Sequence, residues 1–242
     1  MAGEPRRRDG SHERRGMRQL ALGVKLRDGA TFASFATGGN AEILSALRGG
    51  GKLVWLWGAR GAGKTHLLQA MCADAQSAAY LPLGDAGRLP PEVLGGFENT
   101  GVLCLDDVDA VCGDLQWERT LFALFNACAD LPTRLVFAAS AAPRRLAWIL
   151  EDWRSRAAAC AVFHVRELDE AGRIEALRLR ALRRGLQLPA ETAEYLLRRA
   201  PRDLVSLLSV LDELDEASLA AQRRLTVPFI REALEKSAKI RP

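Results

Sequence analysis

One run of eight residues has the spacing needed to hold a phosphate group. Residues 58–65 read Gly-Ala-Arg-Gly-Ala-Gly-Lys-Thr and satisfy the pattern G-x-x-x-x-G-K-[ST]. Glycines let the backbone curl so that several N–H groups point at one phosphate, and the start of a following helix adds positive potential. Lys64 would reach the β- and γ-phosphates, and the Thr65 hydroxyl would ligate Mg²⁺. The sequence therefore predicts a nucleotide site formed by Gly58, Ala59, Arg60, Gly61, Ala62, Gly63, Lys64, Thr65 and the next residue, His66.

Two aspartates follow a short apolar run, as in a Walker B motif. Residues 102–105 are apolar and end in Asp106 and Asp107. Asp106 would hold the Mg²⁺ shell, usually through water, and Asp107 could orient or deprotonate the attacking water. Alternatively, Asp107 and Asp109 are only solvent-facing polar residues at the end of a strand. Ser140 ends another apolar run and could touch the γ-phosphate, or it could be a turn serine.

Alternating strands and helices would position these residues. Short apolar runs predict strands over residues 54–57, 79–83, 102–105, 135–139 and 161–165. Helices are predicted over residues 64–75 and 115–129, with a brief helix opened by Pro90 and Pro91. This alternation predicts an α/β fold, in which a parallel five-stranded sheet is covered by helices on both faces.

After residue 169 the pattern changes to helices alone. Helical spacing predicts segments over residues 172–184, 190–200, 202–216 and 227–236. The sequence is therefore interpreted as a flexible tail (1–30), an α/β nucleotide-binding domain (31–166) and a small all-helical domain (167–242).

The amino-acid composition excludes some classes of function. Apolar residues make up 48% and charged residues 26% of the chain, and no apolar run approaches the roughly 20 residues that span a bilayer. We therefore expect no membrane association and no secretory signal. The five cysteines are odd in number and form no C-x-x-C pair, which favours free thiols in a reducing cytoplasm.

The positive charge is unevenly spread. The chain has a formal net charge of +4, and residues 1–16 carry five arginines against three carboxylates, which leaves the remainder nearly neutral. Weak or no direct DNA binding is therefore expected. Met17 is followed by an apolar-rich segment, so we hypothesise that residues 1–16 are an upstream extension.

The motif spacing, with a helical domain after the fifth strand, resembles the AAA+ family. Within that family the chain resembles Hda, the regulatory inactivator of the replication initiator DnaA. The resemblance runs from about Gln19 to the last helix. The segments that match are Thr-Phe-Ala-Ser-Phe at 31–35, Leu-Trp-Gly at 56–58, residues 150–156, Leu-Asp-Glu-Ala-Ser at 214–218 and Gln-Arg-Arg-Leu-Thr-Val-Pro-Phe at 222–229. The resemblance implies an AAA+ domain with a helical lid, ADP or ATP with Mg²⁺ as cofactor, and a cytoplasmic regulator of replication initiation.

Resemblance to Hda rather than to a full initiator rests on two further features. The sequence ends at Pro242 without a helix-turn-helix domain, and residues 84–101 are too few for the initiator's insertion that contacts single-stranded DNA. In addition, Gln19, Leu20 and Leu22 resemble the short peptide that binds the sliding clamp of the replicative polymerase, although Gly23 replaces the usual proline or aromatic residue. The resemblance thus implies DnaA and the clamp as partners.

The resemblance also implies an arginine finger. Arg156 matches it, with Arg154 as second candidate, and it would complete the ATP site of DnaA in trans. The alternative is that both are surface arginines on a helix. AAA+ proteins place a lid arginine near the γ-phosphate. The resemblance puts Val205 at that position in this chain, and Arg202 could take the place of the missing arginine. We therefore expect an ADP-tolerant binder with weak intrinsic ATPase activity, and self-association as a homodimer is compatible with AAA+ surfaces.

Three other functions stay open. An autonomous AAA+ ATPase of the helicase-loader or initiator type would act on single-stranded DNA and show DNA-stimulated turnover. A P-loop kinase would need a lid inserted within its α/β domain. A clamp-binding adaptor with a structural nucleotide would tolerate Arg156→Ala.

Overall fold

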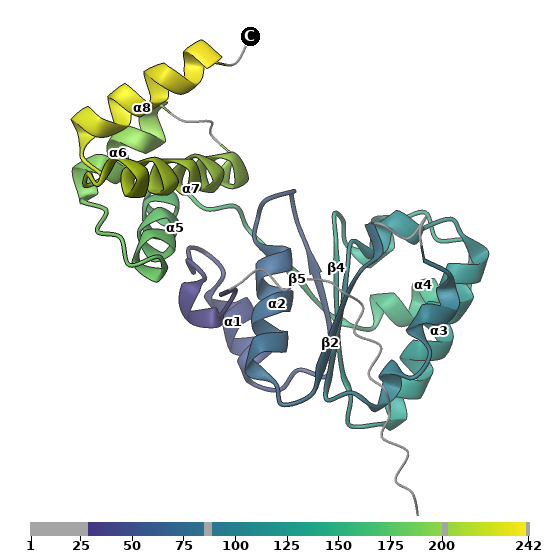
Figure 1. The fold of residues 1–242 in the computed structure, drawn as a ribbon. Helices are drawn as coiled ribbons and strands as arrows, with labels where there is room; N and C mark the ends of the chain where they lie inside the picture. The colour runs from purple at the N-terminus through teal and green to yellow at the C-terminus, as the bar shows by residue number, and fades with distance from the viewer. Residues whose placement is uncertain (1–28, 85–88, 200–202, 241–242) are drawn as a thin grey trace, which may run out of the picture.

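A computed structural model describes residues 29–84, 89–199 and 203–240, without the side chains of residues 236–240. It consists of an α/β domain followed by a domain of helices, as Figure 1 shows. The sheet contains β1 (Leu53–Trp57), β2 (Ala78–Pro82), β3 (Val102–Asp106), β4 (Arg134–Ala139) and β5 (Ala161–His164). All neighbouring strands are parallel, in the order β2-β3-β4-β1-β5. The predicted five-stranded parallel sheet is therefore confirmed.

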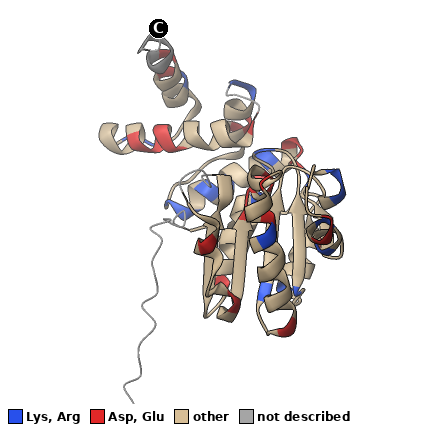
Figure 2. Cartoon of the chain, turned by 90° about the vertical axis from the view of Figure 1, so that its right-hand side faces the viewer, with Lys and Arg blue, Asp and Glu red and all other residues tan. Residues whose placement is uncertain are grey.

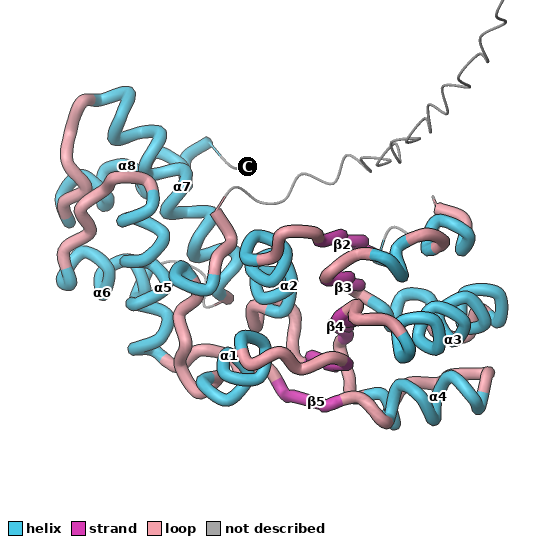
Figure 3. The backbone as a smooth tube through the Cα atoms, turned by 90° about the horizontal axis from the view of Figure 1, so that it is seen from below, coloured by secondary structure: helices cyan, strands magenta, loops and turns pink. Residues whose placement is uncertain are grey.

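Helices cover both faces of this sheet. Figure 3 shows α1 (Ala41–Arg48) and α2 (Lys64–Asp74) on one side, and α3 (Leu115–Asp130) and α4 (Glu151–Ala158) on the other. Because side chains alternate along a strand, β1 contributes to two cores. Val54 and Leu56 pack on the α1–α2 side, whereas Trp55 packs against the α3–α4 side.

The short elements differ most from the prediction. The helix α1 was not predicted, because its eight residues make only about two turns and give a weak periodic signal. The brief helix expected at the two prolines is a single 3₁₀ turn, Pro91–Leu94. Further 3₁₀ turns lie at Phe32–Ser34, Phe97–Asn99, Val108–Val111 and Pro143–Arg145.

The C-terminal domain is built from α5 (Glu170–Arg183), α6 (Ala190–Arg199), α7 (Leu204–Ala221) and α8 (Val227–Ile240). It has its own apolar core, which includes Leu177, Leu196, Leu207, Leu211 and Ile230. The predicted all-helical domain is thus confirmed. Its third helix starts at Leu204 rather than at Arg202, because the Asp203 carboxylate caps it by accepting a 2.8 Å hydrogen bond from Ser206 N.

The charges are mixed in sign over the surface. In Figure 2 basic and acidic residues are interspersed over the α/β domain. All five cysteines are free thiols, three of them buried and two half-buried, as predicted. Of the helices that the structure describes, none has the length and apolar character needed to cross a membrane.

Candidate nucleotide-binding site

The P-loop, residues 58–65, connects the end of β1 to the start of α2. Gly63 has φ +105° and precedes Lys64, the first residue of α2. A Cβ at Gly63 would lie 2.8 Å from Cε2 of Phe35, and one at Gly58 would lie 2.5 Å from the carbonyl oxygen of Val165. These close approaches and the left-handed backbone at Gly63 explain why glycine stands at both positions.

The P-loop lysine folds back over the loop. Lys64 Nζ donates hydrogen bonds to the carbonyl oxygens of Gly58, at 2.7 Å, and Ala59, at 3.0 Å. Burial lowers the pKa of the Lys64 ammonium group, while the negative charges of Asp106, Asp107 and Asp109 oppose that shift. The ammonium group is therefore held over the P-loop, where a phosphate would meet both the lysine and the start of α2.

The carboxylate of Asp106 faces the start of α2. Thr65 Oγ1 donates a 2.6 Å hydrogen bond to Asp106 Oδ2, and Tyr80 Oη donates to the same oxygen at 2.9 Å. Only 1% of Asp106 is exposed. A hydroxyl beside a buried carboxylate is a pair of hard oxygen ligands, which fits Mg²⁺. We call this region, with Lys64, the metal end of the site.

Tyr80 is a member of the metal end that the sequence analysis missed. Burial and the neighbouring Asp106 raise the pKa of its phenol, so the group stays a neutral donor. It reaches Asp106 because β2 pairs with β3, with Tyr80 opposite Cys104. That pairing is a long-range contact without a local sequence signal.

Three predicted polar residues gather at the carboxyl edge of the sheet. Asp109 Oδ2 accepts a 2.5 Å hydrogen bond from Ser140 Oγ, and Asp109 Oδ1 accepts from Ser140 N at 3.1 Å. Asp107 is exposed and has φ +52°. Burial, Asp106 and Asp109 raise the pKa of its carboxyl group. The fold thus brings Ser140, Asp107 and Asp109 beside Asp106.

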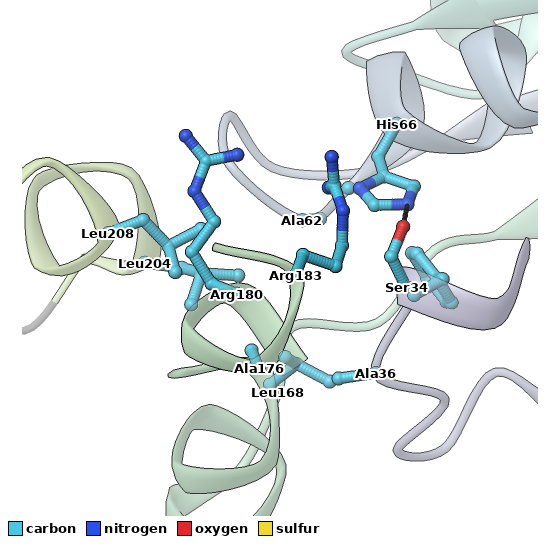
Figure 4. Close-up of a pocket in the computed structure, with 12 residues that line it drawn as sticks. Ser34, Ala36, Ala62, His66, Leu168, Ala176, Arg180, Arg183, Leu204 and Leu208 are labelled. Carbon is cyan, nitrogen blue, oxygen red and sulfur yellow. Dashed lines mark hydrogen bonds between the residues drawn. The ribbon is translucent and has the colours of Figure 1, made fainter. Parts of the chain in front are cut away.

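The opposite end of the site lies between the two domains, and we call it the lid end. A cavity of about 90 Å³ at this end is lined by Ser34, Ala62, Gly63 and His66 and by Arg180 and Arg183 of α5. Figure 4 shows the two arginines facing Ala62, His66 and Ser34. His66 Nε2 lies 2.9 Å from the Thr31 carbonyl oxygen and 3.3 Å from Ser34 Oγ. These contacts tie α2 to the N-terminal segment, residues 29–36.

Val205, at the start of α7, lies against the P-loop. Its Cγ2 atom is 3.3 Å from where a Cβ of Gly61 would stand. The position that the resemblance assigns to a lid arginine is therefore close to the loop but apolar. Arg202, its predicted substitute, and the predicted clamp-binding residues Gln19, Leu20 and Leu22 lie outside the described residues.

The second predicted functional region is α4, on the other face of the sheet. Trp153 and Ala157 anchor this helix with fully buried side chains. Arg154 pairs with Glu151 at 2.6 Å. Arg156 is exposed in the last turn of α4 and makes no ion pair with any residue that the structure describes.

A buried carboxylate fixes the start of α4. Glu118 of α3 is fully buried and accepts backbone hydrogen bonds from Gly113, at 2.8 Å, Ile149, at 2.9 Å, and Leu150, at 2.7 Å. This role was not predicted from the sequence. The available signal was a glutamate on the same helical face as Leu121 and Phe125, where an apolar residue is expected.

Comparison with known families identifies the helical domain. Residues 169–234 match the family model described as "Hda, lid domain". The match spans α5, α6 and α7 and most of α8.

Comparison with solved structures identifies the fold over most of the chain. Domain III of the Thermotoga maritima replication initiation protein DnaA superposes with a TM-score of 0.69 at 20% identity, covering 86% of this chain and 96% of that one. AMPPCP-bound DnaA from Aquifex aeolicus gives 0.59 at 22% identity, covering 72% and 62%. The Thermotoga maritima RuvB Holliday junction branch migration motor gives 0.58 at 17% identity, covering 79% and 64%. At these identities the likeness establishes an AAA+ fold.

Proposed function

Because this chain is an AAA+ protein related to Hda and to DnaA, we propose that it regulates replication initiation by stimulating hydrolysis of the ATP held by DnaA. Arg156 is the arginine finger that it offers. The observation that carries the proposal is the setting of Arg156, an exposed cation at the end of a helix anchored by Trp153, which forms no ion pair with any described residue.

The chain's own site would bind ADP or ATP with Mg²⁺. The P-loop N–H groups and Lys64 bind the phosphates, and Thr65 and Asp106 hold the metal ion, which would neutralise phosphate charge. The DnaA of Aquifex aeolicus, which shares the fold, has been solved with AMPPCP. Val205 beside Gly61 adds no charge at the P-loop, which supports a site that tolerates ADP.

The proposed action of Arg156 follows from its chemistry. A guanidinium group is always charged and presents a planar fork of donors that matches phosphate oxygens. Placed at the γ-phosphate of a neighbouring subunit, it stabilises charge that develops in the transition state. Arg154 is a weaker candidate, because Glu151 already neutralises it.

Two partners complete the proposal. DnaA supplies the ATP, and the sliding clamp on DNA would hold this chain nearby through Gln19, Leu20 and Leu22. The nucleotide at the P-loop would order the surface that meets DnaA. Self-association as a homodimer through AAA+ surfaces is part of the same proposal.

The test measures hydrolysis of labelled ATP bound to DnaA, with this chain and DNA-loaded clamp added together and separately. Fingers supplied in trans accelerate hydrolysis by about 10³–10⁵, and we expect an effect of that order with both present. A double variant, Gln19→Ala and Leu20→Ala, should lose only the clamp-dependent part. No acceleration under any condition would overturn the proposal.

The second candidate is an autonomous AAA+ ATPase of the helicase-loader or initiator type. The presence of Asp107 beside Lys64, Thr65 and Asp106 favours it, and one structure of this fold is a DnaA bound to AMPPCP and single-stranded DNA. It predicts ATP turnover by this chain alone that rises with added single-stranded DNA.

A further inference from the structure

The cavity at the lid end holds two arginines of α5 with different partners. Arg180 directs its fork to Asp212 of α7, with Nε at 3.0 Å from Oδ1 and Nη2 at 2.7 Å from Oδ2. That ion pair holds α5 to α7. Arg183, one turn later, rises from α5 on the side of Ala62 and His66 (Figure 4). Of the two, Arg183 is therefore the one directed at the P-loop side of the cavity.

The Arg183 guanidinium packs directly on the N-terminal segment. A Cβ built on Gly29 would lie only 1.2 Å from Arg183 Nη2, and Gly29 has φ +86°. Any other residue at position 29 would strain the backbone at this positive φ and would require the end of the Arg183 side chain to move. The lid and the N-terminal segment thus meet at this contact.

The cavity is too small for a nucleotide as it stands. Its volume of about 90 Å³ is well below the roughly 300 Å³ at the lower end of small-molecule pockets. An entering nucleotide has to move a wall, and Arg183 is a long, exposed side chain that can turn. The Arg183 side chain would then leave its contact with Gly29 and contact the ligand instead.

The geometry of α2 indicates which part of the ligand Arg183 would meet. The first backbone N–H of α2 with an intrahelical partner is that of Leu67, which donates to Gly63 O at 3.0 Å. The N–H groups of residues 64–66 therefore remain for phosphate. Lys64 and Thr65 lie with Asp106 at the metal end, where the outer phosphates belong. His66 lines the lid cavity instead, so the phosphate nearest the ribose lies on that side.

We propose that Arg183 is the lid residue that binds the nucleotide, through the phosphate nearest the ribose. This inference rests on the proposed nucleotide site. It makes docking of the lid depend on the presence of a nucleotide but not on its γ-phosphate, since AMP, ADP and ATP share that group. Val205 faces Gly61 without a charge. Of the lid residues that the structure describes, the cations lining the cavity are Arg183 and Arg180, and Arg180 is already paired with Asp212.

The test compares the affinities of the whole chain for Mg-ADP, Mg-ATP and AMP by calorimetry. We expect Arg183→Ala to weaken binding of all three by the same factor of roughly tenfold, equivalent to about 1.4 kcal/mol. Arg178→Ala is the matched control, because Arg178 lies exposed on the same helix and does not line the cavity. Val205→Arg should add a preference for ATP over ADP that Arg183→Ala does not remove.

The outcomes are distinguishable. Unchanged or tighter binding by Arg183→Ala would show that the side chain only fills the cavity, and a loss confined to ATP would place the contact at the γ-phosphate; either overturns the inference alone. If the wild-type chain bound none of the three nucleotides, the proposed nucleotide site would be wrong and the role of Arg183 with it. Circular dichroism spectra of the variants without nucleotide control for folding.

Discussion

The P-loop and α4 both present a cation, but in opposite surroundings. Lys64 is half-buried, bonds to two carbonyl oxygens and lies near three carboxylates. Arg156 is exposed and has no ionic partner among the residues described. A cation held by neighbouring polar groups, like Lys64, is preorganised to bind a ligand at its own site. A cation without an ion-pair partner, like Arg156, is available to another molecule. This contrast is the basis for proposing that the P-loop binds a nucleotide of this chain and that Arg156 acts on a partner.

The largest effect that would sharpen the comparison concerns Arg156. We expect Arg156→Ala to lower the stimulated hydrolysis of DnaA-bound ATP by about 10³, with this chain's own nucleotide affinity unchanged. Arg154→Ala is the control, because it removes only an exposed ion pair of the kind worth about 0.2–1 kcal/mol. Single-turnover hydrolysis measures both, and equal losses in the two variants would contradict the assignment.

The converse variant is Lys64→Met, which keeps the apolar stem and removes the charge. Its affinity for Mg-ADP should fall about 100-fold, or about 2.7 kcal/mol, within the range for hydrogen bonds to charged groups. Calorimetry measures the affinity and circular dichroism checks the fold. Binding that survives the change would mean that the loop N–H groups alone hold the phosphates.

A smaller effect is expected on the free energy of unfolding when the anchor of α4 is removed. Glu118→Ala leaves three buried N–H groups without their acceptor, and we expect a loss of about 1–3 kcal/mol in the free energy of unfolding. Glu118→Gln keeps one acceptor oxygen and should lose less. Urea unfolding gives both values. If DnaA stimulation stayed normal in a folded Glu118→Ala protein, α4 would not need this anchor.

The smallest effect is on the pH dependence of stability. Because burial and neighbouring carboxylates raise the pKa of Asp107, its ionised form is disfavoured in the folded state. Below the ordinary carboxyl pKa of about 4, Asp107 is protonated and contributes favourably to the free energy of unfolding. That contribution is lost as the pH rises through the raised pKa of Asp107 and the carboxyl group ionises.

Asp107→Asn, which suits the positive φ equally well, should therefore raise the Tm of the nucleotide-free protein at pH 7. The rise is roughly 1–2 °C, a fraction of a kcal/mol at this size, and it should vanish near pH 4. Thermal scans of both proteins across this range measure it. A Tm difference that grew toward low pH would contradict the sign.

The sequence predicted the features that are local. The P-loop spacing places Lys64 and Thr65 at a helix start, and the apolar run before Asp106 marks a strand, so both positions could be predicted without tertiary information. Tyr80 and Glu118 could not, since each reaches its partners through the pairing of β2 with β3 or the packing of α3 beside α4. Arg183 has only an ordinary place on an amphipathic helix, and its contact with Gly29 exists only once the domains meet.

The central claim is that Arg156 acts on a nucleotide held by another protein, while the chain's own P-loop only needs to bind. The most direct test loads this chain with a non-hydrolysable ATP analogue and follows labelled ATP prebound to DnaA in the presence of DNA-loaded clamp. We expect the label to be hydrolysed as fast as with ADP in this chain's site, and Arg156→Ala to abolish the effect. Label that stays intact unless this chain turns over its own ATP would contradict the account.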